Sequence, residues 1–469
     1  MDTSVRYSPQ KQIMVKTGNS FVPESLKSVV AALRDAGCKQ AFCKLLRPND
    51  NSKQQIYLST DFAKLPPFPL GTVESVVGNS NKPGGVGKKI LRALPHFSWL
   101  NSEGLPVHAP ETKIIFYPQY PEVRLSGFLL GCEASPSQWM KQELRLEGRI
   151  LVIGVTVERN LVAALIAPGS AAAKELSALL KDKPQHDLFL ELSLELPKLV
   201  NSREALLAKL LEIHRLGWIA AQKLEPDKSK KPYNSRNSGG YTLEAECGIL
   251  PNGKSEPDYL GWELKQYKVT QCARFLIAAR ISVMTPEPDG GFYCEHGAQS
   301  FVRKYGYINA TKPDRYDFTG RHNADELNAK TNIVMTIAGY DSEKRHITDA
   351  DGGIHLVSKT DGEIAASWSF AKLSDHWQRK HNHAVYVPSR TQQEPKAHFY
   401  CPVVRLAQGT SFGKYLDAIN DGHVFFDPGM KIENASTKPK VHRRSQFRIT
   451  ADKVHHLYDQ IEAVTLADE

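Results

Sequence analysis

The sequence predicts an α/β protein in two parts, a C-terminal mixed sheet flanked by helices and, before it, a β-rich α+β domain. Three observations predict this fold class. Short apolar runs separated by Gly, Pro and Asn turns fill most of residues 1–196. Helix-like and strand-like patterns then alternate over residues 197–469. The length of 469 residues fits two or three domains.

The N-terminal part is mostly predicted strand. Apolar residues at helical spacing predict a helix over 25–36, and a second helix is predicted from Pro168 to about Lys181. The leucines of 187–196 alternate, which predicts a half-buried strand. Further strands are predicted at residues 40–46, 55–59, 113–117, 123–132 and 150–157.

Composition indicates an ordinary folded protein, with 41% hydrophobic and 24% charged residues. No apolar run is long enough to span a membrane, and the N-terminus lacks the apolar core of a signal peptide, so we expect the cytoplasm. The seven cysteines include no CxxC pair, which predicts reduced and mostly buried thiols. The net charge of +9 suits a polyanionic partner, although solubility alone explains it equally well.

The C-terminal part should begin after Pro197–Val200, with a helix that starts at Asn201 and carries a leucine stripe. A buried strand is predicted over 275–284, and Thr360-Asp-Gly362 predicts a hairpin turn. Other strands are predicted at 331–338, 354–358 and 363–368.

One stretch carries a chemical pattern: Asp258, then Glu263 five positions later, then Lys265. On a strand Glu263 and Lys265 share one face, while Trp262 and Leu264 point to the other. Two carboxylates with a lysine beside them can hold Mg²⁺ next to a phosphodiester. Taken alone the pattern is weak, because charged residues often face solvent on an edge strand.

A second stretch lies just upstream, at residues 237–249. It predicts a Gly-rich turn and then a short helix that starts near Thr242 and carries Glu244. Glu246 lies on nearly the same turn of that helix and is an alternative partner for the site.

The order of Gly-rich turn, helical Glu, loop and D-x4-E-x-K strand resembles the PD-(D/E)xK nuclease core, and specifically the MvaI/BcnI family of restriction endonucleases. The resemblance covers residues 198–469. It includes the segments at 368–373, 384–387, 406–427 and 447–449.

The resemblance implies Mg²⁺-dependent hydrolysis of double-stranded DNA. Asp258 and Glu263 would bind the metal, with the carbonyl of Leu264 as a third ligand. Lys265 would position the attacking water and stabilise charge on the phosphate. Glu244 would bind a second metal ion or orient Lys265.

The resemblance also nominates residues for base reading: Asp427 and Arg448, with His442 and Arg444 as neighbours. Family members carry Asp-x-Arg where this chain reads Asp427-Pro-Gly-Met. Either Lys431 or Arg444 substitutes for the missing Arg, or the protein recognises a different DNA sequence. A solvated charge run is the alternative for this basic tail.

A basic loop before the Glu244 helix contains Lys230, Lys231 and Arg236. It either grips the DNA backbone or is simply solvated. Elsewhere, Cys294-Glu-His296 lacks a second ligand pair for zinc. His381 and His383 could share a strand face, and we expect ordinary surface histidines there.

The resemblance implies a sequence-specific endonuclease that cuts a short, G/C-rich, pseudo-palindromic site. It also implies a monomer, and we expect a cognate DNA methyltransferase in the same system. Residues 1–196 would be a DNA-binding or effector module, and 197–469 the nuclease, with its core at about 200–285 and DNA recognition at about 330–469. The alternatives are a phage-defence or repair nuclease without strict sequence specificity, and a non-catalytic DNA-binding protein on a retired nuclease fold.

Overall fold

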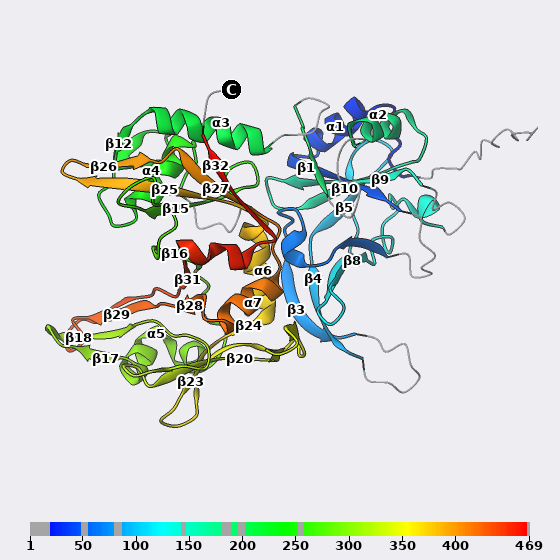
Figure 1. Cartoon of the computed structure of the whole chain (residues 1–469). Coiled ribbons are helices and arrows are strands. Elements are labelled where there is room, and N and C mark those ends of the chain that lie inside the picture. Colours follow the sequence, from blue (N-terminus) through cyan, green and yellow to red (C-terminus); the bar gives the residue numbers. More distant parts are fainter. Residues whose placement is uncertain are drawn as a thin grey trace, which may run out of the picture. The chain divides into compact units, whose positions relative to one another are not determined.

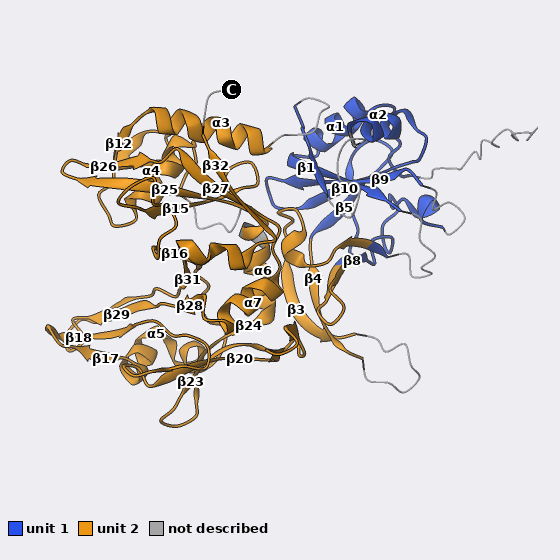
Figure 2. Cartoon of the chain, viewed as in Figure 1, with its two compact units in different colours: residues 1–56, 96–113, 125–199 blue, residues 57–95, 114–124, 200–469 orange. Residues whose placement is uncertain are grey.

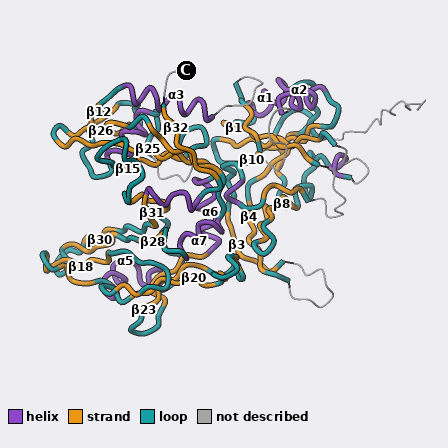
Figure 3. Tube along the Cα trace, in the orientation of Figure 1, coloured by secondary structure: helices purple, strands orange, loops and turns teal. Residues whose placement is uncertain are grey.

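The chain forms two compact units, which Figure 2 colours separately. The computed structural model describes residues 19–47, 55–78, 87–141, 147–180, 189–195, 202–251 and 258–466. The first unit comprises residues 1–56, 96–113 and 125–199, and the second comprises residues 57–95, 114–124 and 200–469. Helices are few and short beside the strands and loops (Figure 3). No helix in the described ranges combines the length and apolar character needed to cross a membrane.

The first unit is built on a six-stranded sheet with the order β11-β1-β9-β10-β5-β6. Its strands are β1 (Cys38–Leu46), β5 (Phe97–Leu100), β6 (Pro106–His108), β9 (Arg149–Thr156), β10 (Leu161–Ile166) and β11 (Leu190–Leu192). Its helices are α1 (Leu26–Asp35), α2 (Ala171–Leu180) and the 3-10 turn η2 (Ser137–Met140). β9 and β10 are buried along their whole length, as expected for central strands.

Both predicted helices of this region are confirmed. α1 begins after Ser25, whose hydroxyl accepts a hydrogen bond from the backbone of Ser28 at 3.2 Å, and so satisfies one of the free amides of the first turn. The buried side of α1 packs with α2 and the sheet. The strand predicted over 187–196 is shorter than expected, because β11 covers only Leu190–Leu192; residues 181–188 and 196 lie outside the described residues.

A five-stranded sheet follows, with the order β2-β8-β7-β4-β3. Its strands are β2 (Ile56–Ser59), β3 (Thr72–Val77), β4 (Lys89–Leu94), β7 (Lys113–Tyr117) and β8 (Glu122–Ser126), with the 3-10 turn η1 (Phe62–Lys64) after β2. Asp61 joins this region to the C-terminal part of the second unit. Its buried carboxylate accepts hydrogen bonds from Ala63 N at 2.8 Å and from Phe412 N at 3.2 Å, at the start of α7 (Phe412–Asn420).

The largest sheet of the second unit has the order β12-β26-β25-β27-β32, and β15 pairs with the remaining edge of β25 (Figure 1). The strands are β12 (Trp218–Ala220), β15 (Glu263–Lys268), β25 (His383–Gln393), β26 (Lys396–Tyr400), β27 (Val403–Gln408) and β32 (Gln460–Thr465). α3 (Ser202–Arg215) and α4 (Ser238–Glu246) pack on one face through Leu206, Leu210 and Leu243. The other face belongs to a separate, larger core.

Smaller sheets complete the unit. Their strands are β13 (Gln222–Leu224) with β14 (Lys230–Pro232); β16 (Arg280–Met284), β31 (Phe447–Thr450) and β28 (Val424–Phe426); β17 (Tyr307–Asn309), β18 (Lys312–Thr319), β29 (Gly429–Glu433) and β30 (Lys440–His442); β19 (Leu327–Asn328), β20 (Ile333–Ala338), β23 (Gly353–Ser358) and β24 (Ile364–Ser369); and β21 (Tyr340–Asp341) with β22 (His346–Ile347). The remaining helices are α5 (Phe292–Tyr305), α6 (Phe370–His381) and the 3-10 helix η4 (Ala451–Leu457).

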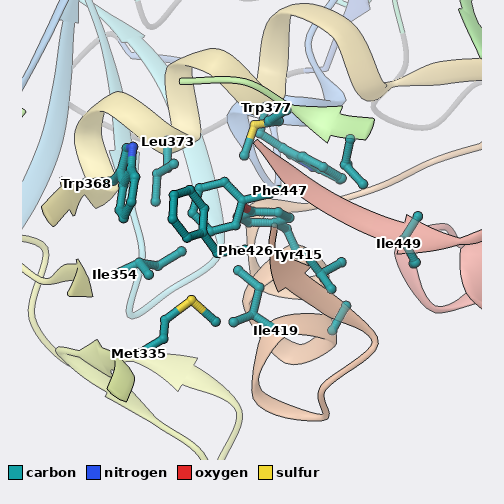
Figure 4. Close-up of a cluster of buried hydrophobic side chains, with 14 of the residues drawn as sticks. Met335, Ile354, Trp368, Leu373, Trp377, Tyr415, Ile419, Phe426, Phe447 and Ile449 are labelled. Carbon is teal, nitrogen blue, oxygen red and sulfur yellow. The ribbon is translucent and has the colours of Figure 1, made fainter. Parts of the chain in front are cut away.

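Aromatic side chains fill the larger core (Figure 4). Trp368 packs on Phe426 and Phe447 with ring centroids 4.9 and 5.2 Å apart, so β24, β28 and β31 meet in one cluster. Trp377 and Tyr415 add α6 and α7, at a centroid distance of 4.7 Å. Rings of this size bury large apolar areas, which fixes the sheets around the helices. The predicted strands at 331–338, 354–358 and 363–368 are confirmed as β20, β23 and β24.

Apart from the start of α4, three predictions about this unit are wrong. Residues 275–279 are not strand, because the pairing of β16 with β31 ends at Arg280. Cys272 and Cys401 form a disulfide, so not all the thiols are reduced. Their Cα atoms are 5.4 Å apart, within the range a disulfide requires, but a sequence separation of 129 gives no local sign of the pairing. His381 is the last residue of α6 and is fully buried against Trp377, so it is not a surface residue. Because it lies on a helix, it does not share a strand face with His383, which is itself largely covered.

Candidate active site on strand β15

The strand β15 presents two different faces, and each has its own surroundings. It pairs in parallel with β25, so that Glu263 lies beside Ala384 and Lys265 beside Tyr386. Trp262 and Leu264 point to the opposite face, where they join the core formed with α3 and α4. Since side chains alternate along a strand, packing of these two residues turns Glu263 and Lys265 toward the larger core.

Glu263 and Lys265 form an ion pair on that face. The Lys265 Nζ atom lies 2.6 Å from Glu263 Oε1, and their side chains are 15% and 3% exposed. Two charges two positions apart on one strand face stand close together by geometry alone. Burying a single charge is costly, and this ion pair offsets part of that cost.

A tight turn returns Asp258 to the beginning of the same strand. Tyr259 and Trp262 exchange backbone hydrogen bonds of 2.9 and 2.8 Å around the two residues between them. Both of these residues have a positive φ angle, 47° at Leu260 and 84° at Gly261. A two-residue hairpin turn requires such angles to match the twist of the strands that it joins. Consequently an oxygen of Asp258 accepts a hydrogen bond from the Leu264 amide at 2.8 Å.

The donor set fits a hard divalent cation. Asp258 is half-buried and anchored to the amide that follows Glu263, so two carboxylates lie at the start of one strand. Carboxylate oxygens are the ligands that Mg²⁺ prefers, and this ion keeps several waters when it binds one or two of them. Among the described residues no group of three or more His, Cys, Asp or Glu side chains is placed to hold a metal ion.

The helix α4 covers the Leu264 face of the strand. It begins at Ser238, so the predicted start near Thr242 is wrong, and the expected Gly-rich turn is the first turn of the helix. The glycines permit close packing: a Cβ on Gly239 would lie 2.7 Å from the Gln266 side chain of β15. Tyr400 further fixes this turn by donating a hydrogen bond to the Gly239 carbonyl at 2.7 Å.

The two candidate glutamates of α4 differ in their partners. Glu246 accepts hydrogen bonds from Gln222 at 2.5 Å and from Lys230 at 2.7 Å. Glu244 is half-buried. Burial, as the largest cause, raises the pKa of the nearby Cys247 thiol to about 12, and the charges of Asp258, Glu246 and Glu244 contribute to the rise.

The predicted basic loop is the β13–β14 hairpin and the turn after it. Lys230, Lys231 and Arg236 are exposed there, and Lys230 is held by Glu246. Lys396 joins the loop to β26 by donating hydrogen bonds to the carbonyls of residues 234 and 235 at 2.9 and 2.7 Å. A pocket of about 610 Å³ lies between this hairpin and the β25–β26 turn.

The predicted base-reading residues fall into two groups. In the first, Asp427 is largely buried and its carboxylate binds the guanidinium groups of Arg448 at 2.9 Å and Arg280 at 3.2 Å. Arg280 was missed by the sequence reasoning, since it lies 147 residues from Asp427 and only the pairing of β16 with β31 brings them together. No local sequence signal points to Arg280.

The second group lies on β29 and β30. Glu433 pairs with Lys431 and, at 3.1 Å, with His442, and the lysine holds the pKa of this carboxyl down at about 2. Arg444 is exposed, and its side chain packs so closely on Gly429 that a Cβ there would lie 2.9 Å from Arg444 Cδ. The four residues Asp427, Lys431, His442 and Arg448 therefore each have a partner within the protein.

Comparison with known proteins places the chain in a family. The family model described as the MvaI/BcnI restriction endonuclease family matches residues 207–458, which is more than half of the chain. Two solved structures are similar. "Restriction endonuclease MvaI-cognate DNA substrate complex" has 15% identity and a TM-score of 0.43, covering 56% of this chain and 98% of its own. "Restriction endonuclease MvaI in the absence of DNA" has 13% identity and a TM-score of 0.33, covering 58% and 100%. No curated protein matches.

The mixed sheet and the family match define the class of protein: a restriction endonuclease, and hence a hydrolase of the nuclease type. The chain belongs to the MvaI/BcnI restriction endonuclease family. The matched residues contain α4 and β15, whereas the whole of the first unit lies outside the match.

Proposed function

We propose that this protein is a Mg²⁺-dependent endonuclease that cuts double-stranded DNA at a specific sequence, with the active site at the start of β15. One observation carries the proposal. In a member of this family, Asp258 and the Glu263–Lys265 pair converge at one end of a single strand. Carboxylates supply the ligands for a divalent ion, and a lysine beside them faces the phosphate that the ion would bind.

Each residue has a distinct role in the proposed reaction. Asp258 and Glu263 bind the ion, with the Leu264 carbonyl as a third protein ligand. The ion, when bound, polarises the phosphodiester and lowers the pKa of a water. Lys265 orients the attacking water and stabilises the charge that develops on the phosphate oxygens. Glu244, from α4, orients Lys265 or holds a second ion.

Recognition is assigned to the C-terminal sheets. Arg448 and Arg444 offer guanidinium groups that can read guanine, and Lys431 and His442 offer further donors. Asp427 holds Arg448 in place. Lys230, Lys231 and Arg236 contact the DNA backbone beside the active site. The site read is short, G/C-rich and pseudo-palindromic.

The chain carries one D-x4-E-x-K stretch, so a monomer would cut the two strands in succession. A cognate DNA methyltransferase would protect the host genome, and the pair would act in the cytoplasm against phage DNA. Residues 1–196, of which 57–95 and 114–124 belong to the second compact unit, are assigned a DNA-binding or effector role. Unchanged affinity and cleavage after their deletion would remove the last assignment.

Digestion of a plasmid and of a phage genome with Mg²⁺ tests the function. Discrete fragments with uniform ends support sequence-specific cleavage, and sequencing of the ends gives the site. A smear would favour the non-specific nuclease instead. Absence of cleavage in both the wild type and Lys265→Ala would favour the non-catalytic DNA-binding protein.

A further inference from the structure

The strands β16, β31 and β28 form a small sheet (Figure 1), and Arg280 is the first residue of β16. Ile281 and its pairing partner Ile449 are buried in the larger core. Side chains alternate along a strand, so the neighbouring Arg280 and Arg448 point to the outer face. Oδ2 of Asp427 lies 3.2 Å from Nη1 of Arg280 and 2.9 Å from Nη1 of Arg448. The two guanidinium groups therefore share a single carboxylate oxygen.

The two arginines differ in the donors that they keep for a ligand. The side chain of Arg448 is 21% exposed, its Nη2 atom donates to the carbonyl of Arg280 at 3.2 Å, and its Nε atom is buried. The side chain of Arg280 is 55% exposed. Within the described ranges, the Arg280 guanidinium has Asp427 as its single hydrogen-bonding partner, through Nη1. The Nε and Nη2 atoms of Arg280 therefore remain for a ligand on the outer face.

These two atoms form one edge of the guanidinium group. The group is planar, and the N–H bonds of Nε and Nη2 on this edge suit a partner with two acceptors side by side. The bond from Nη1 to Asp427 restricts rotation of the group before a ligand arrives. Asp427 is itself held, because its side chain is 11% exposed and its backbone carbonyl accepts from Nε2 of Gln446 at 2.7 Å. A guanidinium restrained in this way loses less side-chain entropy on binding.

The outer face carries more positive than negative charge around Asp427. One carboxylate serves the two guanidinium groups of Arg280 and Arg448, which leaves one positive charge in excess. A third guanidinium, that of Arg321, lies 4.0 Å from the ring centroid of Phe425, which is the partner of Arg448 in the strand register. Positive charge of this kind suits DNA, and the O6 and N7 atoms of guanine are two acceptors side by side in the major groove.

We propose that Arg280 is a specificity-determining residue, whose Nε and Nη2 atoms donate hydrogen bonds to O6 and N7 of one guanine in the recognised site. The inference rests on the proposed function and adds a residue that its set of base-reading residues lacks. Asp427 orients the Arg280 guanidinium. Arg448 supports the same strand end by donating to the Arg280 carbonyl.

The test compares cleavage of duplexes in Mg²⁺, with the recognised site taken from sequencing of digested ends. In each duplex, 7-deazaguanine replaces one guanine of the site, which removes the N7 acceptor alone. The wild type should lose about tenfold in kcat/KM at one of these guanines, the scale of one hydrogen bond to a charged group. Arg280→Ala should cut the unmodified site more slowly and lose nothing further at that guanine, because the donor for N7 is already absent.

Two further variants separate base reading from charge. Arg280→Lys keeps the charge but lacks the planar edge with two donors, so it should lose the same sensitivity while the salt dependence of DNA binding stays as in the wild type. Arg274 is exposed in the loop before β16, and Arg274→Ala should match the wild type on every duplex. Thermal unfolding checks that each variant is folded. If Arg280→Ala does not fold, Arg280→Lys carries the test.

The outcomes distinguish the inference from the proposed function. If the wild type cuts at discrete sites but no guanine gives an effect that the Arg280 variants remove, the inference alone is overturned. The same holds if Arg280→Lys cuts every duplex at the wild-type rate while Arg280→Ala is slowed equally on all, because that pattern indicates a phosphate contact. A wild type that produces a smear, or that cuts no DNA, would overturn the proposed function together with the inference.

Discussion

The ammonium of Lys265 lies 2.6 Å from the carboxylate of Glu263, and the two side chains are almost withdrawn from solvent. A cation bound at Glu263 must therefore share that carboxylate with the lysine. Because both charges are fixed on one strand face, the proposed reaction would couple metal binding and water orientation through a single pair of side chains. The predictions below begin from this pair.

Removing the charge of Lys265 should abolish most of the cleavage. Lys265→Met keeps most of the side-chain volume but leaves Glu263 buried without its partner, so we expect a rate loss of about 100-fold or more and a loss of stability of roughly 3 kcal/mol. Lys268 is exposed at the end of the same strand, and Lys268→Met is the matched control. Equal rates for Lys265→Met and wild type in a Mg²⁺ cleavage assay would refute the role.

Asp258→Asn should separate metal binding from folding. The amide oxygen can still accept the hydrogen bond from the Leu264 amide, so the turn before β15 should persist. The loss of one anionic ligand should weaken Mg²⁺ binding about tenfold or more. Asp258→Ala, which also removes the acceptor, should in addition lower the unfolding temperature. A metal affinity that Asp258→Asn leaves intact would rule Asp258 out as a ligand.

Asp427→Asn should relax sequence recognition rather than stop catalysis. The Asp427 carboxylate binds both Arg448 and Arg280. The asparagine amide in its place has no negative charge and one oxygen acceptor fewer. A misplaced guanidinium loses discrimination worth about 1–3 kcal/mol per base pair. We expect cleavage at sites that differ by one base pair, measured on a panel of oligonucleotide duplexes. Unchanged discrimination would place Arg448 outside the base-reading surface.

Lys231 should contribute a phosphate contact without sequence preference. Lys231→Ala is expected to weaken binding to all duplexes alike and to reduce the slope of log affinity against log salt by about one. Lys231→Arg keeps the charge and serves as the control. Lys230 is less informative, since its ammonium also holds Glu246 at 2.7 Å. A salt slope identical in Lys231→Ala and wild type would assign this loop to solvent.

Acid should destabilise the second unit through His322. This residue is fully buried, and burial lowers its pKa to about 4, below the usual 6.5. The unfolded state then binds a proton more tightly, so the free energy of unfolding falls as pH drops from about 6.5 to about 4. His322→Gln should make that fall shallower, measured by urea unfolding at several pH values. An unchanged pH dependence would show that His322 already titrates normally in the folded state.

Much of this molecule follows from local sequence. The helices α1 and α2 and the strands β20, β23 and β24 were predictable, because periodic burial of apolar side chains is a local property. The D-x4-E-x-K spacing likewise defines β15, since two-residue alternation puts Glu263 and Lys265 on one face.

Tertiary structure decided everything that depends on distant segments. The Cys272–Cys401 disulfide and the Asp427–Arg280 contact join residues more than a hundred positions apart, and neither leaves a local signature. The limits of β16 were set by its partner β31, and the burial of His381 by Trp377 and Val283. Spacing along the chain fixes which side chains share a face, whereas the packing of other elements decides what that face meets.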